Sequence, residues 1–91
     1  MNELKAIPVP AKGLTVRQIG DETIIVTEAG EELHTLDETG TFVWSAIDGS
    51  NSLSRILNLI CTEYDVNRDR AREDLLNFVE ALHEKKIVIL D

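Results

Sequence analysis

Between residues 14 and 36 the chain has the hydrophobic and polar pattern of β-strands. A run of β-branched residues at positions 23–27 (TIIVT) forms the centre of this region, and such side chains pack well on a pleated surface. Separators at residues 20–22 and 28–31 each contain a glycine, which tolerates positive φ, so they predict two hairpin turns. The pattern predicts a three-stranded antiparallel meander in which residues 24–26 are central and residues 32–36 form an edge.

After the meander, the apolar spacing changes to a helical period. Asp37, Ser52 and Asn67 are residue types that cap helix N-termini, and each precedes a stretch with apolar residues three and four positions apart. The last apolar run, residues 87–90 (IVIL), predicts a short strand. The expected order is therefore three strands, three helices and one C-terminal strand.

Such an order predicts an α+β fold, because the apolar stripes of three helices must be covered by each other and by one face of the meander. The arrangement is similar to a winged helix-turn-helix. Pro8 and Pro10 favour an extended path, so residues 1–12 are expected to form an extended tail and residues 13–91 the domain. The positions expected in the core are Val16, Ile24, Val26, Val43, Trp44, Ile47, Leu53, Ile56, Leu57, Ile60, Leu75, Phe78 and Leu82.

Composition narrows the class of protein. With 91 residues and 43% apolar content, the chain is the size of one globular domain. Nine basic against seventeen acidic side chains give a net charge of −8, which disfavours nucleic acid as a partner. No apolar run approaches the roughly 18 residues of a membrane span. The single cysteine and the absence of a visible signal segment favour a cytoplasmic protein.

Catalytic signatures are missing from the sequence. It contains no phosphate-binding glycine loop, no HExxH and no GxSxG motif. His34 and His83 are expected at the surface and Cys61 as a buried, inert thiol, so neither a metal site nor a cofactor is expected. A chain without an activated nucleophile, a metal cluster or a phosphate cradle is expected to bind a partner rather than to catalyse a reaction.

One segment carries a family resemblance. Residues 36–49 (LDETGTFVWSAIDG) resemble the PqqD family in having a strand that ends in Leu, a small-residue pair, an apolar helix and Asp-Gly. Residues 53–64 are similar to the second helix of that family, residues 74–82 to its third helix and residues 87–90 to its closing strand. The resemblance extends from about residue 14 to residue 91.

The resemblance implies a function in peptide recognition. PqqD-like domains bind the leader segment of a ribosomally made precursor peptide, without catalysis, and present it to a modifying enzyme, often a radical SAM protein. They use the edge strand of the meander and the third helix. On this chain, the implied peptide-binding edge comprises Glu32, Leu33, His34, Thr35 and Leu36.

The third helix offers a further set of candidate residues. Leu76 and Val79 lie beside its expected core stripe, and Arg72 precedes them at a helical spacing. We expect Leu76 and Val79 to line a groove against the edge strand, with Arg72 guiding a peptide carboxylate. The alternative is that Leu76 and Val79 complete the core or meet the N-terminal tail. An uncovered edge strand is suited to this role because it exposes unpaired N–H and C=O groups.

Two departures from the family pattern concern the pathway. Residues 28–30 read EAG where the member of the family that acts in pyrroloquinoline quinone synthesis usually has Pro-Glu-Gly, and Asp37 replaces the commoner Asn. The resemblance therefore implies peptide binding without assigning the chain to the quinone pathway.

Three other functions fit parts of the sequence. A winged-helix DNA-binding protein would use Arg68, Arg70 and Arg72, but residues 65–74 hold three basic and four acidic groups. A carrier protein would bear its prosthetic group on Ser52, but the strand-rich first third is foreign to an all-helical carrier. A general protein-interaction module unrelated to peptide maturation is the third alternative.

Overall fold

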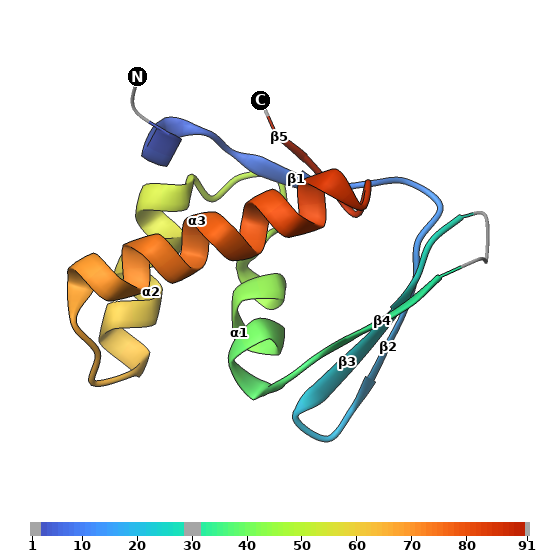
Figure 1. Cartoon of the computed structure of the whole chain (residues 1–91), viewed down its shortest axis with the longest axis horizontal. Coiled ribbons are helices and arrows are strands. Elements are labelled where there is room, and N and C mark those ends of the chain that lie inside the picture. The colour runs from blue at the N-terminus through green and yellow to red at the C-terminus, as the bar shows by residue number, and fades with distance from the viewer. Residues whose placement is uncertain (1–2, 29–31, 91) are drawn as a thin grey trace.

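The computed structural model describes residues 3–28 and 32–90 of the chain. Three helices gather beside a three-stranded meander, and a second, two-stranded sheet lies at the opposite end of the molecule from the turn between the first two strands of the meander (Figure 1). The elements in order are η1 (Glu3–Lys5), β1 (Pro8–Pro10), β2 (Thr15–Ile19), β3 (Glu22–Val26), β4 (Leu33–Leu36), α1 (Glu38–Ala46), α2 (Leu53–Glu63), α3 (Arg68–Glu84) and β5 (Val88–Leu90).

The meander confirms the α+β prediction. Its strand order is β2-β3-β4 and both pairings are antiparallel, so β3 is central and β4 is an edge strand, as expected. In the register, Val16 is opposite Ile25, and Ile25 is opposite His34. The first hairpin turn lies at residues 20 and 21, whereas the second expected turn falls at residues 29–31, outside the described residues.

The face of the meander that meets the helices differs from the expectation. Ile25 is fully buried, whereas Val16 is 44% exposed and Ile24 and Val26 are half-buried on the opposite face. The prediction that Val16, Ile24 and Val26 belong to the core is therefore wrong. The run TIIVT is apolar on both faces, so it does not specify which face is covered, and a shift of one residue exchanges the two faces. Val16 shares the face of Ile25, but it lies on the outer strand β2, all of whose residues are exposed.

The three predicted N-caps are all confirmed. The backbone N–H of Gly40 donates to the Asp37 carboxylate at 2.8 Å. In the same way, Ser52 accepts from the N–H of Arg55 at 3.2 Å and Asn67 from that of Arg70 at 3.0 Å. Each bond satisfies one of the backbone donors that a helix start leaves free, so the starts of the helices are determined by short-range signals.

The core lies between the helices and the inner face of the meander. Eight of the expected residues are buried there: Val43, Ile47, Leu53, Ile56, Leu57, Ile60, Leu75 and Leu82. Trp44 and Phe78 were expected there too, but both are half-buried and pack against the edge of the core. Residues that were not expected complete the core: Ile25, Leu36, Ala46, Ala71, Val79, Ile87 and Val88.

The N-terminal segment is extended at Pro8–Pro10, as predicted, but it is also paired. Strand β1 pairs antiparallel with β5, with Pro8 opposite Leu90 and Pro10 opposite Val88. The backbone N–H of Leu53 donates to the Ala6 carbonyl at 2.9 Å, which ties the same segment to the start of α2. This segment is therefore docked on the domain rather than loose beside it.

Two leucines of α2 test the position of the core. Leu57 is fully buried, whereas Leu59 on the same helix is half-buried. We expect Leu57→Ala to lower the free energy of unfolding by about 2–5 kcal/mol, because it removes buried methyl groups and leaves a cavity. The matched variant Leu59→Ala should cost only about 1 kcal/mol. Urea denaturation of both variants measures the difference, and equal losses would contradict this placement of α2.

Candidate functional site

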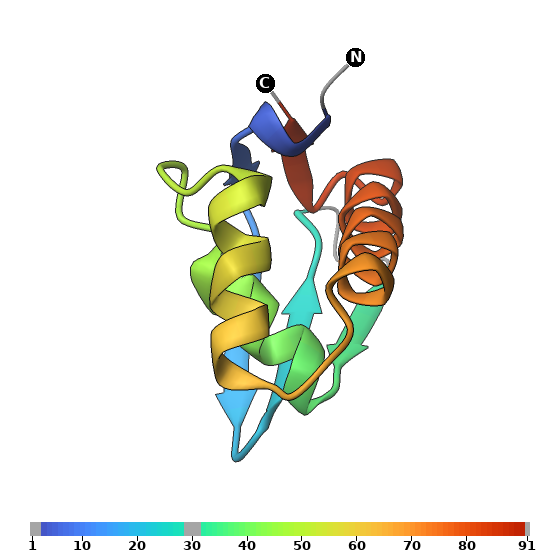
Figure 2. The ribbon, with the colours of Figure 1, turned by 90° about the vertical axis from the view of Figure 1, so that its left-hand side faces the viewer.

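The candidate site lies between the free side of β4 and helix α3. Helix α3 packs on α2 and β5, whereas the inner face of β4 packs on α1. The end-on view shows α3 on one side of the molecule and α1 and α2 on the other, with β3 visible between them (Figure 2). Strand β4 is thus an edge strand flanked by a helix that does not close over it, and the described residues form a hollow near each of its ends.

The first hollow, here called the anchor hollow, lies where β4 ends and has a volume of about 310 Å³. Its walls come from the start of α1, the end of α2 and the first half of α3, and they are mostly apolar. The apolar lining residues are Val43, Ile60, Val66, Ala71, Leu75 and Phe78. A hollow of this kind accepts one apolar side chain from a partner.

Gly40 keeps the anchor hollow open. A Cβ at this position would lie 3.2 Å from the Cβ of Leu36 and 3.4 Å from Cε1 of Phe78. A methyl group there would touch the Phe78 ring at ordinary contact distance and would require Leu36 and Asp37 to give by a few tenths of an ångström. The glycine therefore allows β4, α1 and α3 to meet closely at this point.

The rim of the anchor hollow is polar. Arg70 and Asp74 form an exposed ion pair of 3.5 Å one helical turn apart on α3. Tyr64 packs edge-on against Phe42 with ring centroids 5.5 Å apart. Partial desolvation, followed by the charge of Glu38, raises the pKa of Tyr64 above its ordinary value.

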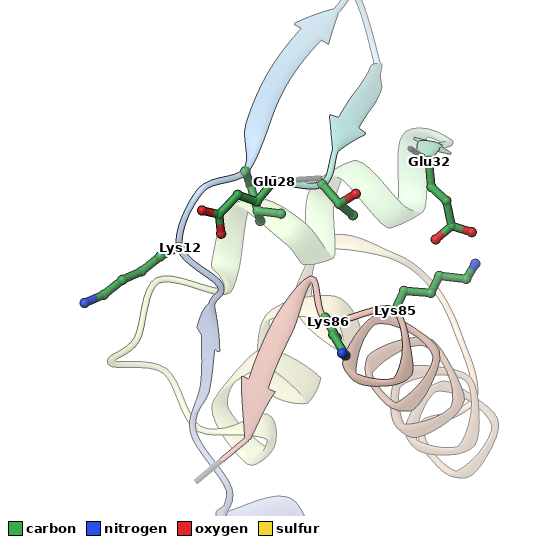
Figure 3. Close-up of a pocket in the computed structure, with 7 residues that line it drawn as sticks. Lys12, Glu28, Glu32, Lys85 and Lys86 are labelled. Carbon is green, nitrogen blue, oxygen red and sulfur yellow. The ribbon is translucent and has the colours of Figure 1, made fainter. Parts of the chain in front are cut away.

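The second hollow, here called the lysine hollow, lies at the start of β4 and has a volume of about 550 Å³. Three of the four lysines of the chain line it, namely Lys12, Lys85 and Lys86. Figure 3 shows Glu32 and Lys85 reaching into the same gap from opposite sides, while Lys12 extends away from it. Within the described ranges, none of the three lysines forms an ion pair.

Lys86 has a backbone conformation that favours glycine. Its φ is 63°, the only positive φ of a non-glycine residue in the described part of the chain. The N–H of Lys86 donates to the carbonyl of His83, and the N–H of Ile87 to that of Leu82. These two bonds are the Schellman pattern that ends many helices, usually with glycine at this position. The chain thus retains a strained lysine at the edge of the lysine hollow.

The structure divides the predicted edge residues between the two faces of the sheet. His34 and Leu36 face inward, because they are opposite Ile25 and Thr23, which are both buried. Leu33 and Thr35 face outward, and Leu33 is 64% exposed. Glu32 precedes the strand and lines the lysine hollow. His34 is half-buried, unlike His83, which is exposed as expected. Cys61 is half-buried rather than buried.

The structure does not bring the predicted residues of α3 together with β4. Val79 is 1% exposed and belongs to the core, so the expectation that it lines an exposed groove is wrong. Leu76 lines a separate hollow of about 410 Å³ together with Ala6 and Leu90, which do not belong to the meander. Arg72 is exposed. The buried stripe of α3 consists of Ala71, Leu75, Val79 and Leu82. Because side chains on a helix point in fixed directions, Leu76 then lies on the flank of α3 away from β4.

Sequence reasoning missed the residues of α3 that border the anchor hollow. These are Arg70, Asp74 and Phe78, which share one face because they are spaced by four residues. Lys85 continues the same face seven residues after Phe78. The four-residue spacing indicates that these side chains share one face of α3. It does not indicate that this face borders the hollow, because that depends on which stripe of α3 is buried.

Comparison with known proteins agrees with the fold. Residues 22–88 match the family model described as coenzyme PQQ synthesis protein D (PqqD), so the chain belongs to the PqqD family. A relative from Xanthomonas campestris pv. campestris (strain B100), a PqqA binding protein, is 29% identical over 62 residues, which are 68% of this chain and 67% of that protein.

Two solved structures share the architecture. TbiB1 in complex with the TbiA(beta) leader peptide has a TM-score of 0.82 and 26% identity, covering 88% of this chain and 93% of TbiB1. Lasso peptide synthetase B1 complexed with its leader peptide has a TM-score of 0.81 and 18% identity, covering 91% of this chain and 98% of the other. In the described part of this chain, no helix is long and apolar enough to cross a membrane.

The strained backbone of Lys86 at the end of α3 can be tested directly. We expect Lys86→Gly to be about 1 kcal/mol more stable than Lys86→Ala, because only glycine adopts positive φ without a steric penalty. Both variants remove the same charge, so their difference isolates the backbone. Thermal or urea denaturation gives the comparison, and an alanine variant as stable as the glycine variant would show that the residue does not adopt this conformation.

Proposed function

We propose that this chain is a non-catalytic peptide-binding domain. It captures the leader of a ribosomal precursor peptide by adding the leader as a strand to β4, and it presents the precursor to a modifying enzyme. The observation that carries the proposal is the open edge of β4 beside α3, with a hollow near each end of the strand. The names of its relatives support the same role, since one binds PqqA and another is in complex with a leader peptide.

Of the two edges of the meander, β4 is better suited to a peptide than β2. All five residues of β2 are exposed, and the hollow that Gln18 of β2 lines together with residues of α1 and α2 is more polar than apolar, so a strand added there would bury little apolar surface. A strand added to β4 would have α3 and the anchor hollow beside its inner face. Main-chain pairing gives affinity in such complexes, and pockets for alternate side chains give specificity.

Main-chain pairing alone is too weak for the task. In an antiparallel edge strand, alternate residues point their N–H and C=O groups outward, so the four residues of β4 offer about four hydrogen bonds. At about 0.5–1.5 kcal/mol each, these give about 2–6 kcal/mol, while association costs about 4–15 kcal/mol. An apolar side chain in the anchor hollow would add about 1.5–3 kcal/mol. The proposal therefore needs both the edge and the hollow.

The proposed site comprises the backbone of Leu33–Leu36 with Glu32 at its start, the inward side chains of His34 and Leu36, and Phe78 on α3. Arg72 and Leu76 are left outside it, because Leu76 lies on the other flank of α3. The modifying enzyme is proposed to be a radical SAM protein, the frequent partner of PqqD-like domains. Ribosomal precursors are made in the cytoplasm, which places the proposed function there.

An NMR titration tests the proposed site. The probe is a synthetic peptide covering the leader of a short precursor gene beside the gene for this chain, added to the ¹⁵N-labelled full chain. We expect amide shifts along Leu33–Leu36 and near Phe78. Shifts confined to β2 or to the β1–β5 sheet would overturn the site, and the absence of any shift at millimolar peptide would overturn the proposed function.

Strand addition also predicts a period of two in the bound peptide. We expect N-methylation of alternate peptide residues to weaken binding about two- to tenfold per lost hydrogen bond, because only every second N–H pairs with β4. Methylation of the residues between them should have little effect. Fluorescence anisotropy with a series of singly methylated peptides measures the pattern, and sensitivity without alternation would exclude strand pairing.

A further inference from the structure

The imidazole of His34 has an unpaired nitrogen at the proposed site. Its Nε2 is buried and has no hydrogen-bond partner among the described residues, although the side chain as a whole is 13% exposed. The closest carboxylate oxygen, Oε1 of Glu32, is 3.7 Å away, which is too long for a hydrogen bond. Buried polar groups in folded proteins almost always have a partner, so this nitrogen requires an explanation.

A peptide strand added to β4 would place a side chain beside the partly exposed His34 ring, and a turn of that ring would bring its buried Nε2 to the side chain. Residues directly opposite each other in adjacent strands share one face of the sheet, with Cβ atoms about 4.5–5.5 Å apart. His34 faces inward with Ile25, so the peptide residue opposite His34 must face inward too. This residue would lie closer to Nε2 than any other part of the peptide.

The surroundings of His34 select the chemistry of that residue. A hydroxyl group both donates and accepts, so it can complement Nε2 whichever ring nitrogen carries the proton. Where it accepts from Nε2–H, its own proton is free to donate to Glu32. Glu32 and Lys85 reach into the gap at the start of β4 (Figure 3), so a charged side chain of either sign would meet one like and one opposite charge there, whereas a neutral hydroxyl needs no counter-charge. An apolar side chain would leave the nitrogen buried and unpaired.

We therefore propose, resting on the proposed function, that His34 is a specificity-determining residue. It selects a leader with a neutral hydrogen-bonding side chain, Ser or Thr foremost, opposite itself. The anchor hollow lies beside Leu36, two residues further along β4. In an antiparallel pairing, the commoner arrangement, the leader then carries an apolar residue at one position and Ser or Thr two residues closer to its C-terminus.

Peptide selection tests this pattern without knowledge of the natural leader. A display library of random linear ten-residue peptides is selected on the full chain and, in parallel, on His34→Leu. We expect peptides from the unaltered chain to combine a large apolar residue with Ser or Thr two positions later. On His34→Leu, the second position should become apolar while the first stays unchanged.

Binding measurements then assign the contact to His34. For one selected peptide, replacing its Thr by Val should weaken binding to the unaltered chain about two- to tenfold, the range of one hydrogen bond. The same replacement should change binding to His34→Leu less than twofold. The matched control is His83→Leu, which alters the other histidine on the exposed surface of α3 and should respond like the unaltered chain.

The outcomes separate the two proposals. Selected peptides that shift the amides of β4 but show no Ser or Thr preference, or an equal loss from Thr to Val on His34→Leu, would overturn only the role of His34. A hydroxyl residue on the N-terminal side of the apolar residue would overturn the antiparallel pattern. Selected peptides that leave β4 unshifted would overturn the proposed function itself.

Discussion

A short chain of buried hydrogen bonds joins the meander to the helices, and the site depends on it. The hydroxyl of Thr23 on β3 donates to that of Thr41 on α1 at 2.8 Å, and the hydroxyl of Thr41 donates to the Leu36 carbonyl at 3.4 Å. Thr23 and Leu36 are cross-strand partners. The end of β4 is therefore held against α1 through its inner face. Its pairing with β3 uses one edge of the strand, and the other edge stays available. Buried bonds of this kind fix one arrangement because any alternative leaves a polar group unpaired.

Local signals in the sequence were sufficient for the meander and the three helices, but not for strand β1, which forms by pairing with β5. Asp37, Ser52 and Asn67 mark the helix starts because a capping side chain acts within three residues of itself. The edge position of β4 also followed, since a meander places its third strand outside. These features need no knowledge of what packs against what, and for that reason they could be predicted.

Which side chains belong to the site could not be predicted in the same way. The run at residues 23–27 is apolar on both faces, so only the packing of α1 determines that Ile25 faces inward. Helix α3 carries four apolar residues close together in the sequence, Leu75, Leu76, Phe78 and Val79, and these can form more than one apolar stripe. Tertiary contacts bury Leu75 and Val79 and turn Phe78 toward the anchor hollow. Where a helix has surplus apolar residues, its rotation is determined by its neighbours rather than by its own sequence.

The pairing of β1 with β5 has a consequence for how such a domain can be combined with others. Pro8 on β1 lies opposite Leu90 on β5, and Figure 1 shows these two strands at the end of the molecule away from the β2–β3 turn. Polypeptide entering at one of these residues and leaving at the other would pass through neighbouring points in space. A domain with this geometry can be inserted into a surface loop of a larger enzyme, or joined to it on either side, without stretching the host chain.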